Sequence, residues 1–396
     1  MKRILLLLFT AGLSASAFAQ PKLSPTQQAA TDLFKSGKAD EAIPLFKKAL
    51  TENPKDAYSL NALDVIYFQA GRYTEVYECA SKGIIATNGG LPFVSMKAEA
   101  AYQLHKYPEA IKLVDDYNKK NSPDARLLFV KGKCLEANGD AQAAIVSYTA
   151  AMTADPSYAE PFLARGNYLS GLGRLAPAIK DYDQFITLSP EDPEGYNMRG
   201  IAKYKNGDFA AAVADYSKAI ELKPGYAQAI ANRAMAKRDN GDLYTALVDF
   251  EAAIKLLPND DTYYFEEAIT YDRLKAFAQA VPLINQAIII QPNKSVYYVE
   301  QSRLLLQFEY YDQAKTAAES AIRLSPENPE GYLMKSVALS NAEKWPEALV
   351  AINIGIAKNE TYYLFYMQRA NIYRHQGNNA LAESDDAKAK NLASKL

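Results

Sequence analysis

A single period of 34 residues runs through almost the whole chain. A small apolar residue recurs at this interval eleven times, with no insertion or deletion between its copies. These residues are Ala42, Val76, Ala110, Ala144, Ala178, Ala212, Ala246, Ala280, Ala314, Ala348 and Ala382. A fixed period of about 20–50 residues indicates units that stack in series, because one such unit cannot bury its apolar face alone. The period therefore predicts a repeat array.

Eleven repeats fill the sequence from residue 23 to residue 396. We number the positions within a repeat as columns 1 to 34, which places the Ala42 series in column 20. The predicted repeats are 23–56, 57–90, 91–124, 125–158, 159–192, 193–226, 227–260, 261–294, 295–328, 329–362 and 363–396. With residues 20–22 they are predicted to form a single domain, 20–396.

Two helices are predicted in each repeat. Column 8 carries Ala, Gly or Ser in every repeat except the second, which has Asp64. Such small residues allow two antiparallel helices to approach closely. Glycines mark the turn between the helices in seven repeats, and prolines at column 32 end the second helix in seven. Apolar residues recur at helical spacing in both halves, without strand-like alternation. The sequence therefore predicts an all-α fold of 22 helices.

These patterns resemble the tetratricopeptide-repeat (TPR) family across residues 23–396. The match is closest over 125–327, and 207–216 (GDFAAAVADY) is typical of the family. The resemblance implies a TPR-type α-solenoid, a right-handed superhelix of antiparallel helix pairs with a concave groove that binds a protein or peptide. Repeats two and three depart from the pattern at Asp64, Gly83, the Asn88-Gly89-Gly90 link and Tyr117.

In the family, columns 2, 5, 6, 9 and 12 of the first helix line the groove. The resemblance therefore implies an apolar set and a polar set of partner-binding residues. The apolar set is Phe129, Leu163, Met198, Ile201, Met235, Phe265, Ile269, Val299, Leu333, Met334, Val337 and Met367. The polar set is Asn167, Asn197, Asn232, Arg303 and Asn371. The alternative, that these side chains pack against neighbouring repeats, stays open at this point.

Four repeats carry an arginine at column 7 and an aspartate 16 residues later, at column 23. No repeat has one residue of the pair without the other. The pairs are Arg165 and Asp181, Arg199 and Asp215, Arg233 and Asp249, and Arg369 and Asp385. This co-occurrence predicts structural salt bridges between the two helices of a repeat. The alternative reading is a site for an anionic ligand.

The last repeat differs on the face that would otherwise bury a following repeat. Glu383, Asp386 and Lys390 stand where other repeats mostly carry aliphatic or aromatic residues. Because a stacked array needs a polar outer face at its end, these three residues predict a C-terminal cap.

The first 19 residues have the layout of a secretory signal peptide. Lys2 and Arg3 precede an apolar run from Ile4 to Phe9, and the segment ends in Ala17-Phe18-Ala19. We expect cleavage before Gln20 and export to the periplasm, the cell envelope or the medium. The run is too short to span a bilayer, which makes an uncleaved anchor the weaker alternative.

Composition argues against several classes of function. Without Lys2 and Arg3, the chain has 42 basic and 46 acidic residues, too few clustered cations for nucleic-acid binding. No later segment reads as membrane-spanning. Two histidines and two cysteines, scattered in sequence, favour neither a metal site nor a cofactor nor a catalytic triad. We therefore predict a non-enzymatic protein-interaction scaffold.

Polysaccharide or peptidoglycan binding is the first alternative function, and an enzyme with an unrecognised site in the groove is a remote one.

Overall fold

The computed structural model describes residues 23–395, and these residues form α-helices joined by short turns. The predicted signal peptide lies outside them. The first helices of the repeats are α2 (Pro25–Lys35), α4 (Ala57–Gln69), α6 (Leu91–Gln103), α8 (Ala125–Ala137), α10 (Glu160–Gly171), α12 (Pro193–Lys205), α14 (Ala227–Asp239), α16 (Asp261–Arg273), α18 (Ser295–Leu306), α20 (Pro329–Asn341) and α22 (Tyr363–His375). The second helices are α3 (Ala39–Glu52), α5 (Tyr73–Ala86), α7 (Tyr107–Asn118), α9 (Ala141–Ala154), α11 (Leu175–Leu188), α13 (Phe209–Leu222), α15 (Leu243–Leu256), α17 (Phe277–Ile290), α19 (Tyr311–Leu324), α21 (Trp345–Lys358) and α23 (Asn379–Ala393).

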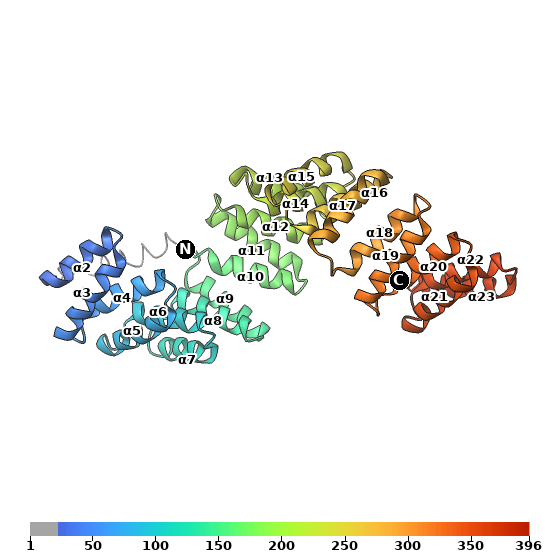
Figure 1. The fold of residues 1–396 in the computed structure, drawn as a ribbon. Helices are drawn as coiled ribbons and strands as arrows, with labels where there is room; N and C mark the ends of the chain where they lie inside the picture. The colour runs from blue at the N-terminus through green and yellow to red at the C-terminus, as the bar shows by residue number, and fades with distance from the viewer. Residues whose placement is uncertain (1–22, 396) are drawn as a thin grey trace. The chain divides into compact units, whose positions relative to one another are not determined.

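The helices form two compact units, one up to Pro190 and one from Glu191 onward. Within each unit, every first helix packs against its own second helix and that helix packs against the next repeat (Figure 1). The predicted all-α architecture of stacked helix pairs is confirmed. The single uninterrupted array and its right-handed superhelix stay predictions. None of the helices in residues 23–395 is long and apolar enough to cross a membrane.

The turn at column 15 has a left-handed backbone in every repeat. Seven repeats place glycine there, as in Gly207 with φ of 85°, which glycine adopts without steric cost. The other four place His105, Lys275, Glu309 and Glu343 there, with φ between 58° and 60°. The turn is therefore imposed by the packing of the helix pair, even where the local residue disfavours it.

Within each helix pair, the side chain at column 8 of the first helix faces the side chain at column 24 of the second, and their sizes are related. Three repeats place glycine at column 8 beneath a fully buried tyrosine at column 24. A Cβ atom added to Gly132 would lie 2.4 Å from the Tyr148 ring, and one added to Gly200 would lie 2.7 Å from the Tyr216 ring. Repeats with valine, isoleucine or alanine at column 24, such as Ile284, carry alanine or serine at column 8, except repeat two, which pairs Ala80 with Asp64. The core is thus packed as complementary pairs.

The predicted C-terminal cap lies on α23. Glu383 and Lys390 are exposed, and Asp386 forms an ion pair with Arg374 of α22. Ala382 and Ala389 of the same helix are buried. The last helix thus presents a charged face where the second helices of other repeats bury apolar side chains.

Candidate functional site

The seventeen residues predicted to line the groove differ widely in exposure. Three are buried, namely Asn197, Val299 and Leu333. Three are exposed, namely Asn167, Met367 and Asn371. The half-buried remainder is Phe129, Leu163, Met198, Ile201, Asn232, Met235, Phe265, Ile269, Arg303, Met334 and Val337. The structure therefore does not show a continuous open apolar stripe along the first helices.

Aromatic rings of neighbouring helices cover the largest apolar members of this set. The Phe129 ring lies 5.8 Å from the Tyr148 ring and 5.6 Å from the Tyr158 ring. The Phe265 ring lies 4.9 Å from that of Tyr297, in the next repeat. Edge and tilted contacts of this kind stabilise the stack. Phe265 thus packs against the next repeat, as the alternative reading of the sequence proposed, whereas both ring partners of Phe129 belong to its own repeat.

Most of the predicted polar anchors are bonded within the chain. Asn197 Nδ2 donates to the Tyr226 hydroxyl at 3.3 Å, and Asn232 Nδ2 donates to Asn197 Oδ1 at 3.3 Å. In unit one, the Tyr182 hydroxyl donates to Asn167 Oδ1 at 2.9 Å. Asparagines in these rows thus connect neighbouring helices and have less capacity left for a partner.

A network of charged groups crosses the first helices of unit two. Asp239 accepts hydrogen bonds from the Tyr204 hydroxyl at 2.5 Å and from Arg238 Nε at 3.2 Å, and its carboxylate lies 2.9 Å from Arg273 Nη1. Arg238, which is 5% exposed, also donates to Glu266 Oε2 at 2.5 Å. Hydrogen bonds from the Tyr204 hydroxyl and from Arg238, together with the charges of Arg238 and Arg273, hold the pKa of Asp239 below its usual range, despite its burial.

A second ion-pair group continues this network on α16 and α18. Arg303 Nη2 lies 2.8 Å from Asp272 and 2.5 Å from Glu300. Sequence reasoning missed both groups and assigned Arg303 to partner binding. The sequence does contain a pattern that indicates these ion pairs, because oppositely charged residues stand at columns 6, 9, 12 and 13 of successive repeats. These carboxylates and guanidinium groups stabilise the stack.

The exposed apolar member of the predicted groove set lies in repeat eleven. Met367 of α22 is 51% exposed, and Asn371 lies one turn further along the same helix and is exposed. Met334 and Val337 of the preceding first helix, α20, are half-buried. The two helices contact each other, and we call these four residues the α20–α22 face. Methionine side chains adapt well to partners of varied shape.

The four column 7 arginines bind the column 23 aspartates with both arms of the guanidinium group. The Nη2–Oδ1 distances are 2.6 Å for Arg165–Asp181 and for Arg199–Asp215, and 2.8 Å for Arg233–Asp249 and for Arg369–Asp385. The aspartates are 4–5% exposed. In two repeats a lysine joins them, since Lys203 lies 2.8 Å from Asp215 and Lys237 lies 2.8 Å from Asp249. The guanidinium charges are thus neutralised within the fold.

The remaining arm of these arginines reaches back to the preceding repeat. Arg165 Nη1 donates to Thr149 Oγ1 at 2.7 Å, and Arg369 Nη1 donates to Asn353 Oδ1 at 2.8 Å. Each acceptor stands 16 residues before its arginine, at column 25 of the preceding repeat. Column 7 therefore ties two consecutive second helices to one first helix. The sequence analysis found the forward partner and missed this backward one.

An apolar groove lies among the helices α7, α8 and α9 of unit one. It has a volume of about 580 Å³, and Leu128 and Leu135 of α8 line it together with Ile111 of α7. The α9 side is lined by Ala143, Val146, Ser147 and Ala150, which recur at spacings of three and four residues. We call this the α7–α9 groove.

Small residues of α9 open this groove. In repeat four, column 23 is Ser147, whose hydroxyl donates to Leu128 O at 2.9 Å and which takes no part in an Arg–Asp pair. Lys131, at column 7, instead binds Asp115 of α7 at 2.5 Å. Val146 stands at the rim and is 58% exposed. An exposed apolar concavity of this kind is a docking feature.

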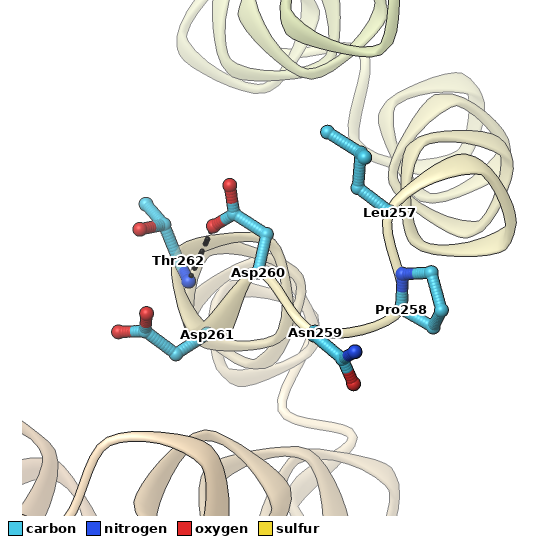
Figure 2. Close-up of a pocket in the computed structure, with 6 residues that line it drawn as sticks. All are labelled: Leu257, Pro258, Asn259, Asp260, Asp261 and Thr262. Atoms are coloured by element: carbon cyan, nitrogen blue, oxygen red, sulfur yellow. Dashed lines mark hydrogen bonds between the residues drawn. The ribbon is translucent and has the colours of Figure 1, made fainter.

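A second pocket, of about 460 Å³, follows the link between α15 and α16 (Figure 2). Its lining is the run from Leu257 to Thr262, in which Asp260 caps α16 by accepting from Thr262 N at 3.0 Å. Asp261 already binds the Lys294 ammonium at 2.6 Å and the Tyr297 hydroxyl. Both carboxylates thus serve the turn and the next repeat.

Residues 23–395 were searched for metal-ligating clusters and for reactive cysteines. Those residues hold no group of three or more metal-ligating side chains. Cys79 and Cys134 are both buried and unpaired with each other. Burial raises the pKa of the Cys134 thiol to about 12, which removes its nucleophilic thiolate at neutral pH.

Three family models match the chain. The models described as tetratricopeptide repeat match residues 95–159, 163–227 and 296–328. A model described as anaphase-promoting complex, cyclosome, subunit 3 matches residues 35–117. These matches fall on the helix pairs that the 34-residue period defines. The chain is a tetratricopeptide-repeat protein. Members of this family bind proteins or peptides, and their fold suggests an interaction scaffold.

Solved structures similar to this TPR protein match it loosely. The structure of the APC/C hetero-tetramer Cut9–Hcn1 is 12% identical in sequence, and the match covers 94% of this chain and 94% of that one, with a TM-score of 0.46. The structure of yeast Tom70 is 15% identical, and the match covers 93% of this chain and 91% of that one, also with a TM-score of 0.46. The structure of MamA is 24% identical, covers 41% of this chain and 94% of its own, and has a TM-score of 0.39. No curated protein matches in sequence. The family assignment rests on the repeat models and the observed helix pairs.

Proposed function

We propose that this TPR protein is a non-enzymatic scaffold of the bacterial cell envelope that binds a partner protein or peptide. The observation that carries the proposal is the serial stack of helix pairs with open apolar surfaces at two places. The charged groups of α14, α16 and α18 pair with one another, whereas Met367 and Val146 are exposed apolar side chains. The signal-peptide layout of residues 1–19 supports an envelope or secreted location.

The first proposed docking surface is the α20–α22 face. It lies on the first helices, where TPR relatives bind their partners, and it keeps Met367 and Asn371 exposed. The methionines supply adaptable apolar contact and the amide can bond an extended peptide backbone. Of the predicted groove, this part is the most accessible.

The second proposed docking surface is the α7–α9 groove on the second helices. Its lining residues on α9 recur along one face of the helix over about 10 Å, since seven residues rise at 1.5 Å each. That length suits two or three apolar side chains of a short amphipathic helix.

Crosslinking in the exporting cell tests the proposal. Photoreactive groups at Met367, in the α20–α22 face, and at Val146, at the groove rim, are expected to capture a defined partner. The same group at Val248 and Val350 provides matched controls, because these valines share column 22 with Val146 and are 64% and 60% exposed, but do not line the groove. Capture of one protein at equal yield from all four positions would contradict specific docking.

Val146→Glu is expected to weaken partner binding through the groove by about tenfold or more, because an ionised carboxylate cannot enter an apolar contact without losing hydration. Val248→Glu and Val350→Glu are expected to leave binding within about twofold. Titration calorimetry with the captured partner measures this. If Val146→Glu binds normally while Met367→Asp does not, the α20–α22 face alone carries the partner.

Polysaccharide or peptidoglycan binding is the alternative proposal. The exposed, stacked pair of Phe308 and Tyr310, with ring centroids 6.0 Å apart, offers a flat aromatic surface of the kind that sugars contact. Co-sedimentation with purified peptidoglycan separates this alternative from protein binding. Retention of the protein on peptidoglycan and loss of that retention in Phe308→Ala/Tyr310→Ala would favour it.

A further inference from the structure

Repeat two has a buried carboxyl group at the centre of its helix-pair contact. Asp64 stands at column 8, where every other repeat has Ala, Gly or Ser, and it is 0% exposed. Neither of its carboxyl oxygens has a hydrogen-bond partner among the described residues, and neither has the hydroxyl of Ser59. A buried carboxylate in this situation loses its hydration with no compensating bond.

The pairing of columns 8 and 24 explains how an aspartate fits there. Column 24 of repeat two is Ala80, which leaves more room than the Tyr148 or Phe250 of other repeats. The walls are apolar, since α4, α5 and α6 contribute Leu63, Val76 and Phe93 to the same buried cluster. The site has room for the carboxyl group and holds no cation that would neutralise its charge.

The charged and titratable groups around Asp64 do not neutralise it. The Cys79 thiol of α5 is the nearest titratable group, and its Sγ lies 3.4 Å from the Leu60 carbonyl, which accepts its hydrogen bond. Lys82 of α5 and Lys47 of α3 act on that thiol only through longer-range attraction. Burial raises the pKa of Asp64 to about 8, and the thiol offsets this only in part.

We propose that ionisation of Asp64 weakens the α4–α5 contact of repeat two, so that this repeat is a pH-sensitive joint of the array. Ionisation places an unpaired charge between two close-packed helices. The charge reaches water only if α4 and α5 separate or water enters between them. The other ten repeats, with small neutral residues at column 8, lack this dependence.

The sign of the effect follows from the two protonation states. The pKa of Asp64 is raised on folding, so the folded repeat binds a proton that the unfolded chain releases above about pH 4, given an ordinary value of 3.8. The equilibrium constant that favours the closed repeat over the open one has its full value below pH 4. It falls about tenfold per pH unit between pH 4 and pH 8 and no further above pH 8, once the folded carboxyl group has ionised.

Hydrogen exchange of the full mature chain tests the proposal. After correction for intrinsic exchange, the protection of α4 and α5 peptides is expected to fall about tenfold per pH unit from pH 5 to pH 8 and then level off. Asp64→Ala restores the usual column 8 residue and is expected to remove the slope while retaining protection. A wild-type profile that is flat in α4 and α5, or a slope that persists in Asp64→Ala, would overturn the proposal.

Repeat nine offers the reverse experiment. Ser302 is a fully buried column 8 residue opposite Ala318, the same small partner that Asp64 faces. Ser302→Asp is expected to confer the same pH-dependent loss of protection on α18 and α19, with α4 and α5 unchanged. Ser302→Ala is the matched control and is expected to show no slope. If Ser302→Asp protects α18 and α19 equally at pH 5 and pH 8, a buried column 8 carboxyl group does not suffice and the proposal fails.

Discussion

Asp215→Ala is expected to lower the free energy of unfolding of the repeats around it by about 3–5 kcal/mol, because it leaves buried cations without their carboxylate. Asp215 is 5% exposed and contacts both Arg199, at 2.6 Å, and Lys203, at 2.8 Å. These cations keep 19% and 21% of their side chains exposed, which gives them partial access to water. The lower end of the range is therefore the better expectation. Urea unfolding followed by circular dichroism measures the loss.

A double-mutant cycle separates the ion pair from loss of packing. Arg199→Ala/Asp215→Ala is expected to be less destabilising than the sum of the two single variants, because the double variant leaves no uncompensated guanidinium. Simple additivity would rule out the pairing as a source of stability. Glu221→Ala is the matched control, since Glu221 pairs with Lys218 on the surface and is 69% exposed. Its loss is expected to be below about 1 kcal/mol.

Gly132→Ala is expected to destabilise repeat four by about 2 kcal/mol, although alanine is the better helix former. The added Cβ would lie 2.4 Å from the Tyr148 ring. That ring cannot move aside easily, because it is 0% exposed and its hydroxyl donates to Glu136 at 2.6 Å. The α8–α9 contact must therefore widen. Amide exchange of α8 and α9 peptides, together with the urea midpoint, measures the loss.

Two further variants test whether the loss of stability in Gly132→Ala comes from the contact with Tyr148. Gly171→Ala, at the end of α10, meets nothing within 4 Å and is expected to be neutral or to stabilise by up to about 1 kcal/mol. Gly132→Ala/Tyr148→Ile reproduces the Ala268 and Ile284 pair of repeat eight and is expected to recover part of the loss. If Gly132→Ala is as stable as the wild type, the matching of columns 8 and 24 is not a packing constraint.

The candidate site was less accessible to sequence reasoning than the fold. Column position marks Phe265 and Val299 as groove residues, but the Tyr297 ring covers Phe265, and Val299 is 8% exposed. The reason is that first-helix side chains can turn toward the next repeat as well as outward, and neighbouring residues decide between these directions. Asp64 stood out in the sequence as a departure from column 8. Its lack of partners depends on side chains from several helices.

The helix pairs and the forward Arg–Asp partners could be predicted from the sequence, because each depends on spacing within one 34-residue repeat. The contacts between repeats became visible in the folded chain. It showed the backward bond from Arg165 to Thr149, the ion network around Asp239, and the opening of the α7–α9 groove where α9 carries small residues. The physical reason is that a period fixes which faces meet, whereas exposure and partners depend on the shapes and charges of the particular side chains that meet there.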